Sequence, residues 1–191
     1  IGAYLSDISG AFDRVFKNFL MAKLYAAGVG ETYLEFLSSY LEPRIGKVSI
    51  GGIFSECFEL CNTVFQGTVL GPVLWNVFFH DVAPYASSEG GKEAMFADDL
   101  NVFQAFDRHE HNDIVKETLD RTRARVHKWG HRNRVIFDSS KEHLIIIHPE
   151  LGEGATFKLL GCTIDTALRM REAVDSIVAK AKPKIKAILR L

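Results

Sequence analysis

Apolar residues recur along this chain at two periods, one typical of helices and one typical of strands. Glycine and proline residues separate the periodic segments and set the predicted ends of the elements. The first half is predicted to contain a strand ending at Leu5, helices over 14–27 and 31–41, a hairpin of 47–50 and 55–60 around Gly51-Gly52, and a helix from Pro72 to about 82. The second half is predicted to contain a loop over 86–92, a hairpin around Asp98-Asp99, a long helix to about 132, a strand over 144–147 and a hairpin over 157–164.

Two of the predicted helices have a clear apolar face. In the second helix we expect the buried face to hold Tyr33, Leu37, Tyr40 and Leu41. The long helix repeats apolar residues at spacings of four and three: Val115, Leu119, Thr122, Val126 and Trp129. Helices packed on one face of an antiparallel sheet make the expected fold class α+β.

The segment Phe96-Ala97-Asp98-Asp99 places two adjacent carboxylates at the tip of a predicted hairpin. Two neighbouring anions beside apolar walls are costly unless cations neutralise them. A divalent metal such as Mg²⁺ suits this pair, because it takes few protein oxygens and completes its shell with water and phosphate. The alternative is a solvated acidic corner, which turn chemistry also favours.

A third carboxylate, Asp7, lies at the end of the predicted first strand. If that strand lies beside the acidic hairpin, Asp7 can face Asp98 and Asp99. Three carboxylates from two strands can hold two metals about 3.5–4 Å apart, the arrangement of in-line phosphoryl transfer in polymerases and nucleases. The alternative for Asp7 is a strand-end acid in solvent. Asp13, by contrast, is predicted to be a helix N-cap.

Composition and charge indicate the class of protein and the cellular compartment in which such a site would occur. The chain has 191 residues and a net charge of −1, and its three cysteines have no metal spacing, as expected in a reducing compartment. No apolar run approaches the length of a membrane span, so we expect an intracellular protein, with nucleus or cytoplasm undetermined. His127 and His131 are predicted to be surface residues rather than zinc ligands.

Basic residues gather in two stretches that could contact nucleic-acid phosphates. The first stretch comprises Arg121, Arg123, Arg125, Lys128, Arg132 and Arg134, and the second comprises Lys180, Lys182, Lys184, Lys186 and Arg190. For the first stretch, a solvated helix face is an equally good interpretation.

Several segments together resemble the palm motifs of reverse transcriptases, most closely those of non-LTR (LINE- or jockey-like) retrotransposons. The resemblance rests on residues 7–15, on 66–76 and on Phe96-Ala97-Asp98-Asp99. Downstream, Ser140-Lys141 with 144–147 resembles the family's lysine-bearing motif, and 157–164 resembles its Leu-Gly primer-grip hairpin. The resemblance implies a right-hand polymerase palm with incomplete fingers over 1–165 and the start of a truncated thumb over 166–191.

The resemblance also implies roles for individual residues. Asp7, Asp98 and Asp99 would bind two Mg²⁺ ions, which Mn²⁺ can replace. Ile8, which we count among the substrate-binding residues, would offer its backbone carbonyl to the metal site as an extra oxygen. Lys141 would be the general acid for the pyrophosphate leaving group, although a solvated turn lysine is the alternative.

Further residues would contact the incoming nucleotide. Phe12 would lie under the sugar, where a flat ring leaves no room for a 2′-hydroxyl; a core phenylalanine is the alternative. Gln66 and Gly67 would line the nucleotide pocket, where glycine lets the backbone approach the substrate. Family members commonly have Gly-Val-Pro before this Gln-Gly pair, whereas this chain has Thr63-Val64-Phe65, which alters the stiffness of the loop.

The function implied is an RNA-directed DNA polymerase palm that adds deoxynucleotides from dNTPs to a primer 3′-OH. Its partners would be an RNA template and a DNA primer, with no membrane. The alternative is a catalytically silent nucleic-acid-binding remnant of a retroelement. A Ca²⁺ module is disfavoured because no acidic loop has the required alternating ligands. We expect the 191 residues alone to be poorly active or inactive.

Overall fold

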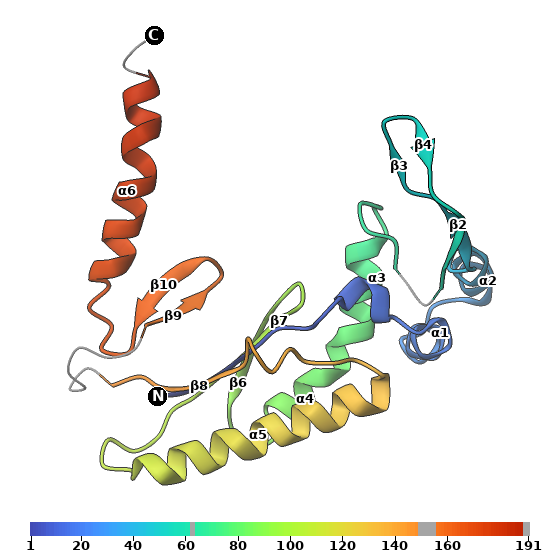
Figure 1. Cartoon of the computed structure of the whole chain (residues 1–191). Helices are drawn as coiled ribbons and strands as arrows, with labels where there is room; N and C mark the ends of the chain where they lie inside the picture. Colours follow the sequence, from blue (N-terminus) through green and yellow to red (C-terminus); the bar gives the residue numbers. More distant parts are fainter. Residues whose placement is uncertain (62–63, 149–155, 189–191) are drawn as a thin grey trace.

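The computed structural model describes residues 1–61, 64–148 and 156–188, and its centre is an antiparallel sheet (Figure 1). The strands are β1 (Gly2–Ser6), β6 (Lys92–Phe96), β7 (Asp99–Gln104) and β8 (His143–Ile146), in the order β6-β7-β1-β8. Ser6 pairs with Leu100 on one side of β1, and Leu5 pairs with His143 on the other. The first strand of the chain is therefore central, and the acidic hairpin forms one edge.

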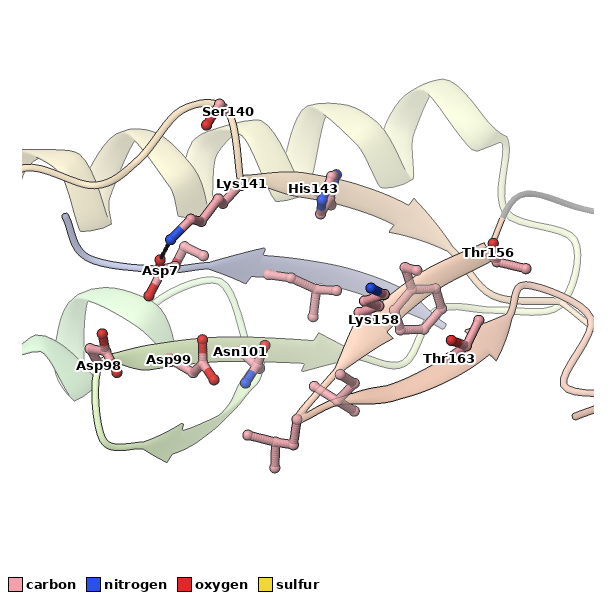
Figure 2. Close-up of a pocket in the computed structure, with 15 residues that line it drawn as sticks. Asp7, Asp98, Asp99, Asn101, Ser140, Lys141, His143, Thr156, Lys158 and Thr163 are labelled. Carbon is pink, nitrogen blue, oxygen red and sulfur yellow. Dashed lines mark hydrogen bonds and ion pairs between the residues drawn. The ribbon is translucent and has the colours of Figure 1, made fainter. Parts of the chain in front are cut away.

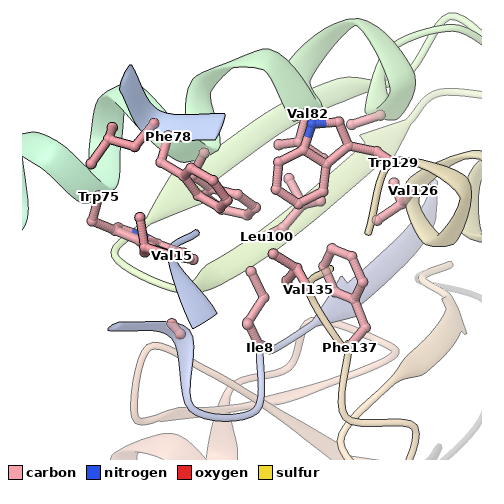
Figure 3. Close-up of a cluster of buried hydrophobic side chains, with 14 of the residues drawn as sticks. Ile8, Val15, Trp75, Phe78, Val82, Leu100, Val126, Trp129, Val135 and Phe137 are labelled. Atoms are coloured by element: carbon pink, nitrogen blue, oxygen red, sulfur yellow. The ribbon is translucent and has the colours of Figure 1, made fainter. Parts of the chain in front are cut away.

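Helices cover one face of this sheet (Figure 1). They are α3 (Gly71–Phe79), α4 (Ala83–Ala86) and α5 (Asn112–Asn133), with the 3-10 helix η2 (His80–Val82) between α3 and α4. Pro72 lies in the first turn of α3, as predicted. The predicted apolar face of α5 is buried along its whole length. Together with Tyr4, Leu100 and Val102 of the sheet, it encloses an aromatic core that contains Trp75, Phe78 and Trp129 (Figure 3).

The predicted hairpin near the C-terminal end lies over the other face of the sheet. It consists of β9 (Thr156–Leu159) and β10 (Cys162–Asp165), and Phe157 packs there with Ala3, Leu5 and Ile147. Its two loop residues, Leu160 and Gly161, have φ values of 48° and 79°. A type I′ turn needs positive φ at both positions.

The helix α6 (Arg171–Ile188) follows this hairpin and contacts β10 (Figure 1). Most of its side chains are exposed, including those of Lys180, Lys182, Lys184 and Lys186. Arg190, the last residue of the second basic stretch, lies outside the described residues. Within the described ranges, no helix is both long enough and apolar enough to cross a membrane.

The predicted first helix is wrong at its start. Residues Ala11–Arg14 form the 3-10 helix η1, and the α-helix α1 runs over Lys17–Ala26. Val15 and Phe16 between them are extended, a conformation in which the Val15 side chain is buried in the core. Asp13 lies inside η1 rather than at a helix start, so the predicted N-cap role is also wrong.

The next helix and ribbon largely match the prediction. The helix α2 covers Glu31–Tyr40; Leu37 and Leu41 are buried, but Tyr33 is 70% exposed, so its predicted place on the buried face is wrong. The predicted hairpin around Gly51-Gly52 is confirmed. It is a two-part ribbon in which β2 (Arg44–Gly46) pairs with β5 (Phe58–Leu60) and β3 (Ser49–Ile50) pairs with β4 (Ile53–Phe54).

Candidate active site

A cleft of about 690 Å³ opens on the face of the sheet that carries the β9–β10 hairpin (Figure 2). Its walls come from the end of β1, the β6–β7 turn, the segment before β8 and the hairpin itself. The cleft is lined by Asp7, Asp98, Asp99 and Lys141, four of the residues predicted from the sequence. The remaining four predicted residues, Ile8, Phe12, Gln66 and Gly67, are not among the residues that line it.

The three acids converge because of strand register. Asp7 directly follows β1, and Asp99 is the first residue of β7. Since Ser6 pairs with Leu100, the next residue of β1 lies opposite Asp99. Asp98 occupies the two-residue turn before β7, and its carboxyl lies within hydrogen-bonding reach of the Asp7 carboxyl. The expected meeting of Asp7 with the acidic hairpin is thus present in the structure.

Electrostatics at this end of the cleft are unfavourable for three free carboxylates. Burial raises the pKa of Asp98, and the nearby charge of Asp7 raises it further. Burial also raises the pKa of Asp99, as do the charges of Asp7 and Asp98. Each shift reports that the ionised form needs a compensating cation.

One such cation is the ammonium of Lys141, which forms an ion pair with Asp7 (Figure 2). It also lies 3.9 Å from Asp138. The hydrogen bond and charge of Asp7 raise the pKa of Lys141, so the lysine retains its proton here. The segment that carries it is tied to β1, because the Asp138 amide donates to the Asp7 carbonyl at 3.0 Å.

The donor set suits Mg²⁺ or Mn²⁺, which prefer carboxylate oxygens. The raised pKa values of Asp98 and Asp99 indicate a deficit of positive charge at the same place. In the part of the chain that the structure describes, however, no group of three or more His, Cys, Asp or Glu side chains has the spacing of a preformed metal centre. The three carboxylates therefore suit a divalent cation by their chemistry and position, but their side chains would need to move to coordinate one.

Ile8 and Phe12 lie beside the cleft rather than in it. The Ile8 side chain is buried in the core, and its backbone bridges to Phe137. The two hydrogen bonds beside this bridge are made by the neighbours of Ile8: the Asp7 carbonyl accepts from Asp138, and the Ser9 amide donates to Ile136. The N–H and C=O groups of Ile8 itself therefore point away from Phe137. Phe12 is half-buried in η1, and its ring stacks on Trp75 at 5.9 Å between centroids.

The loop that carries Gln66 and Gly67 lies next to Phe12. The Val64 amide donates to the Phe12 carbonyl at 2.8 Å. Both Gln66 and Gly67 are exposed, and Gly67 has a φ of 79°, a left-handed conformation that favours glycine. Thr63, part of the altered sequence before this pair, lies outside the described residues.

Sequence reasoning missed a partly buried polar cluster next to Lys141. The Glu142 side chain is only 7% exposed and accepts a hydrogen bond from the Tyr4 hydroxyl at 2.6 Å. His127 also contacts Glu142 at 2.6 Å. Its side chain is 42% exposed, so it lies at the surface as predicted, but with a carboxylate partner that was not predicted. The pairing of Tyr4 with Leu144 in the sheet brings these residues together. Helical spacing and strand alternation carry no signal for such a contact.

Sequence reasoning also missed the polar residues along the rest of the cleft. Asn101, two residues after Asp99 on the same face of β7, is buried. His143 of β8 and Lys158 and Thr163 of the β9–β10 hairpin line the opposite part (Figure 2). Alternation along β7 could have identified Asn101, because residues two apart share a face of a strand.

The first basic stretch, on α5, is largely engaged within the chain. Arg121 and Arg125 both pair with Glu89, and Arg123 pairs with Asp120. The guanidinium of Arg134 lies over the Phe16 ring at 4.6 Å. These contacts favour the interpretation of this stretch as a helix surface.

Comparisons with known proteins identify similar sequences over most of the chain. A family model described as "Reverse transcriptase (RNA-dependent DNA polymerase)" matches residues 3–164. The probable RNA-directed DNA polymerase from transposon X-element of Drosophila melanogaster is 28% identical over 195 residues, covering 94% of this chain and 21% of that protein. The RNA-directed DNA polymerase from mobile element jockey of the same organism is 37% identical over 107 residues, covering 53% of this chain and 12% of that protein. The chain thus spans about a fifth or less of the length of these relatives.

Solved structures with a similar fold include two telomerases. Apo telomerase from Candida tropicalis, truncated from the C-terminal domain, has a TM-score of 0.62 at 15% identity and covers 87% of this chain and 34% of that chain. Telomerase from Candida albicans in complex with the TWJ fragment of telomeric RNA has a TM-score of 0.52 at 9% identity, over 87% of this chain and 29% of that chain. At these identities the likeness concerns the fold alone.

Proposed function

Because this chain belongs to the reverse transcriptase (RNA-dependent DNA polymerase) family, we propose that it forms the palm of an RNA-directed DNA polymerase encoded by a non-LTR retrotransposon. The predicted family and the predicted α+β palm fold are both confirmed. The division into a palm over 1–165 and the start of a thumb over 166–191 stays a prediction.

One observation carries the proposal. Asp7 is separated from Asp98 and Asp99 by about half of the chain in sequence, yet all three meet at one end of an open cleft. Gathering like charges in a partly buried place destabilises the fold, and such an arrangement is typical of functional sites. The alternative of a silent remnant is not favoured, because all three acids are present and converge.

The three carboxylates would hold two Mg²⁺ ions, or Mn²⁺ in their place. When bound, such ions supply charge that activates an attacking primer 3′-oxygen and neutralises the dNTP triphosphate. The chain itself would supply position: the turn before β7 and the end of β1 fix the carboxylates at the cleft, where a primer and an RNA template would lie.

Lys141 would act as the general acid for the pyrophosphate leaving group. Its ammonium lies at the carboxylate cluster, in an ion pair with Asp7. Because this pair raises the pKa of Lys141, proton donation would require the lysine to separate from Asp7 when the site is occupied. A donor at this place could give a proton from Nζ to the leaving oxygen as negative charge develops there.

The nucleotide would be selected next to the cleft, where η1 meets the loop before α3. There the Phe12 ring would lie under the sugar and exclude a 2′-hydroxyl. Ile8 would present its backbone carbonyl, and Gln66 and Gly67 would line the pocket. The hydrogen bond from Val64 to Phe12 supports this placement by tying the two segments together.

Metal binding by the 191-residue chain tests the proposal most directly. We expect saturable Mn²⁺ binding, followed by electron paramagnetic resonance, that is lost in Asp7→Ala. The matched control is Asp113→Ala, which removes an exposed carboxylate at the start of α5. Salt-sensitive RNA binding with no Mn²⁺ binding would instead support the silent remnant.

Primer extension by the complete polypeptide that carries these residues provides the second test. Asp99→Ala is expected to reduce incorporation at least about a hundredfold, because a metal ligand contributes several kcal/mol to the transition state. Equal incorporation by this variant and the unchanged polypeptide would contradict the proposal. We expect the 191 residues alone to be poorly active or inactive.

A further inference from the structure

Trp75 of α3 contacts two parts of the proposed active site at once. Its side chain is 1% exposed, and its indole N–H donates a hydrogen bond of 2.7 Å to the carbonyl of Ala97. Ala97 immediately precedes Asp98 in the acidic turn. The same indole stacks on the Phe12 ring, with centroids 5.9 Å apart and planes inclined by 29°.

The acidic turn needs support of this kind. Ala97 has a φ of 55°, a left-handed conformation that non-glycine residues adopt at a cost and keep only where surrounding contacts hold them. The turn also lies at the edge of the sheet, because β6 is the outermost strand on that side. All five residues of β6 are exposed.

The packing between the turn and α3 is incomplete. A hollow of about 240 Å³ lies between the helix and the hairpin, lined by Asn76, Phe79, His80, Met95 and Ala97. The Trp75–Ala97 hydrogen bond therefore connects the helix layer to the turn beside a gap in the packing. At its other end the indole is fixed by the aromatic core, where it also stacks on Phe79 at 5.1 Å.

We propose that Trp75 is a positioning residue that holds the Asp98-bearing turn in register with the Phe12 ring. One rigid side chain then sets the distance between a metal ligand and the ring that would face the sugar. This inference rests on the proposed function for its catalytic consequence, whereas its structural part concerns the turn itself. Loss of the indole N–H is expected to loosen the turn, weaken metal binding and reduce discrimination against ribonucleotides.

A matched pair of substitutions separates this role from ordinary core packing. Trp129 is also 1% exposed, lies in the same aromatic core, and donates its indole N–H to Asp81 at 2.8 Å. Both tryptophans lie in the same buried cluster (Figure 3). Trp75→Phe and Trp129→Phe each remove one buried indole and one hydrogen bond, but only the first hydrogen bond is made to Ala97. Benzothienylalanine at either position removes the N–H while retaining the shape of the ring, and serves if a phenylalanine variant fails to fold.

The first measurement is amide hydrogen exchange of residues 95–99 in the metal-free 191-residue chain. We expect exchange to be at least about tenfold faster when Trp75 is replaced and unchanged when Trp129 is replaced. Equal exchange in the two variants would overturn the proposal. Because no metal or substrate is present, this result does not depend on the proposed polymerase function.

Two further measurements test the catalytic consequence. The Mn²⁺ dissociation constant is expected to rise by about tenfold for the Trp75 variant, as for supporting residues around other metal sites, and to stay constant for the Trp129 variant. In the complete polypeptide, the ratio of kcat/KM for dNTP over rNTP is expected to fall for Trp75→Phe alone. If the unchanged chain binds no Mn²⁺, the proposed function fails, and the exchange result still decides the role of Trp75 in the turn.

Discussion

The two faces of the central sheet are formed by the same strands but have different roles: one stabilises the fold, and the other carries the candidate active site. On the helix-covered face, Tyr4, Leu100 and Val102 are almost completely buried under the aromatic core. On the cleft face, β7 presents Asp99 and Asn101. Strand alternation therefore lets one segment stabilise the fold with every second residue and place chemistry with the others. The helix face excludes water, whereas the cleft face gathers like charges at a cost in stability.

The largest expected difference between the faces is in core packing. Phe78 is 0% exposed and contacts the rings of Trp75 and Trp129. Phe78→Ala is expected to reduce the free energy of unfolding by about 3–5 kcal/mol, because it removes a buried ring and leaves a cavity. Urea denaturation measures this change. Leu160→Ala, at a cleft residue that is 55% exposed, should change it by no more than about 0.5 kcal/mol, and an equal loss would contradict the comparison.

Substitutions on the cleft face should have the reverse effect: a large loss of catalytic activity and a small change in the free energy of unfolding. Lys141→Met is expected to reduce primer extension by the complete polypeptide about a hundredfold, as for loss of a general acid. Mn²⁺ binding by the 191-residue chain should persist, since lysine is no metal ligand here. Lys116→Met on the exposed side of α5 is the control. Loss of Mn²⁺ binding in Lys141→Met would assign the lysine a positioning role instead of proton donation.

Tyr4 is an exception to the separation of the two faces, because it connects the buried core to a neighbour of the cleft. It belongs to the buried core, yet its hydroxyl donates to Glu142, the neighbour of Lys141. Burial raises the pKa of Tyr4, and the hydrogen bond to Glu142 adds to the shift, so the hydroxyl remains a donor. Tyr4→Phe is expected to lower the free energy of unfolding by about 1–3 kcal/mol, because the nearly buried Glu142 carboxylate loses a partner.

Thermal denaturation checks this expectation for Tyr4. The control is Tyr25→Phe, which removes the hydroxyl of a tyrosine that is 70% exposed. Identical midpoints for the Tyr4 variant and the unchanged chain would mean that the contact with Glu142 contributes nothing to stability.

The smallest expected effect is a gain in stability at the site itself. Burial and the charge of Asp7 raise the pKa of Asp98 in the folded chain, so ionised Asp98 destabilises the fold above that pKa. As pH falls through the raised pKa toward the ordinary value near 3.8, the folded state takes up the proton first and this penalty disappears. Asp98→Asn should therefore stabilise the metal-free chain at pH 7, by an amount on the order of 0.5 kcal/mol.

The pH dependence makes this prediction specific. The stability difference between Asp98→Asn and the unchanged chain should be largest at neutral pH and should shrink toward pH 4. Denaturation over this range measures the difference directly, and the same variant should lose Mn²⁺ binding. A difference that grows as pH falls would contradict the assigned direction of the pKa shift.

Sequence pattern was most informative where a feature depends on neighbouring residues. The buried face of α5, the start of α3 at Pro72 and the hairpin around Gly51-Gly52 all follow from local periodicity or turn chemistry. The same reasoning failed at Val15 and Phe16, where two extended residues separate η1 from α1 and helical spacing carries no signal for the break. It failed at Tyr33 because helical spacing does not say which side chains the neighbouring elements cover.

For the site, the sequence by itself determined which side chains are present and which elements carry them: a strand end for Asp7 and a hairpin tip for Asp98. Only the tertiary structure decided that these two meet, that Lys141 pairs with Asp7, and that Trp75 reaches the carbonyl of Ala97. The physical reason is that periodicity and turn preferences act over a few residues, whereas strand order and register arise from the packing of the whole sheet and bring distant residues together.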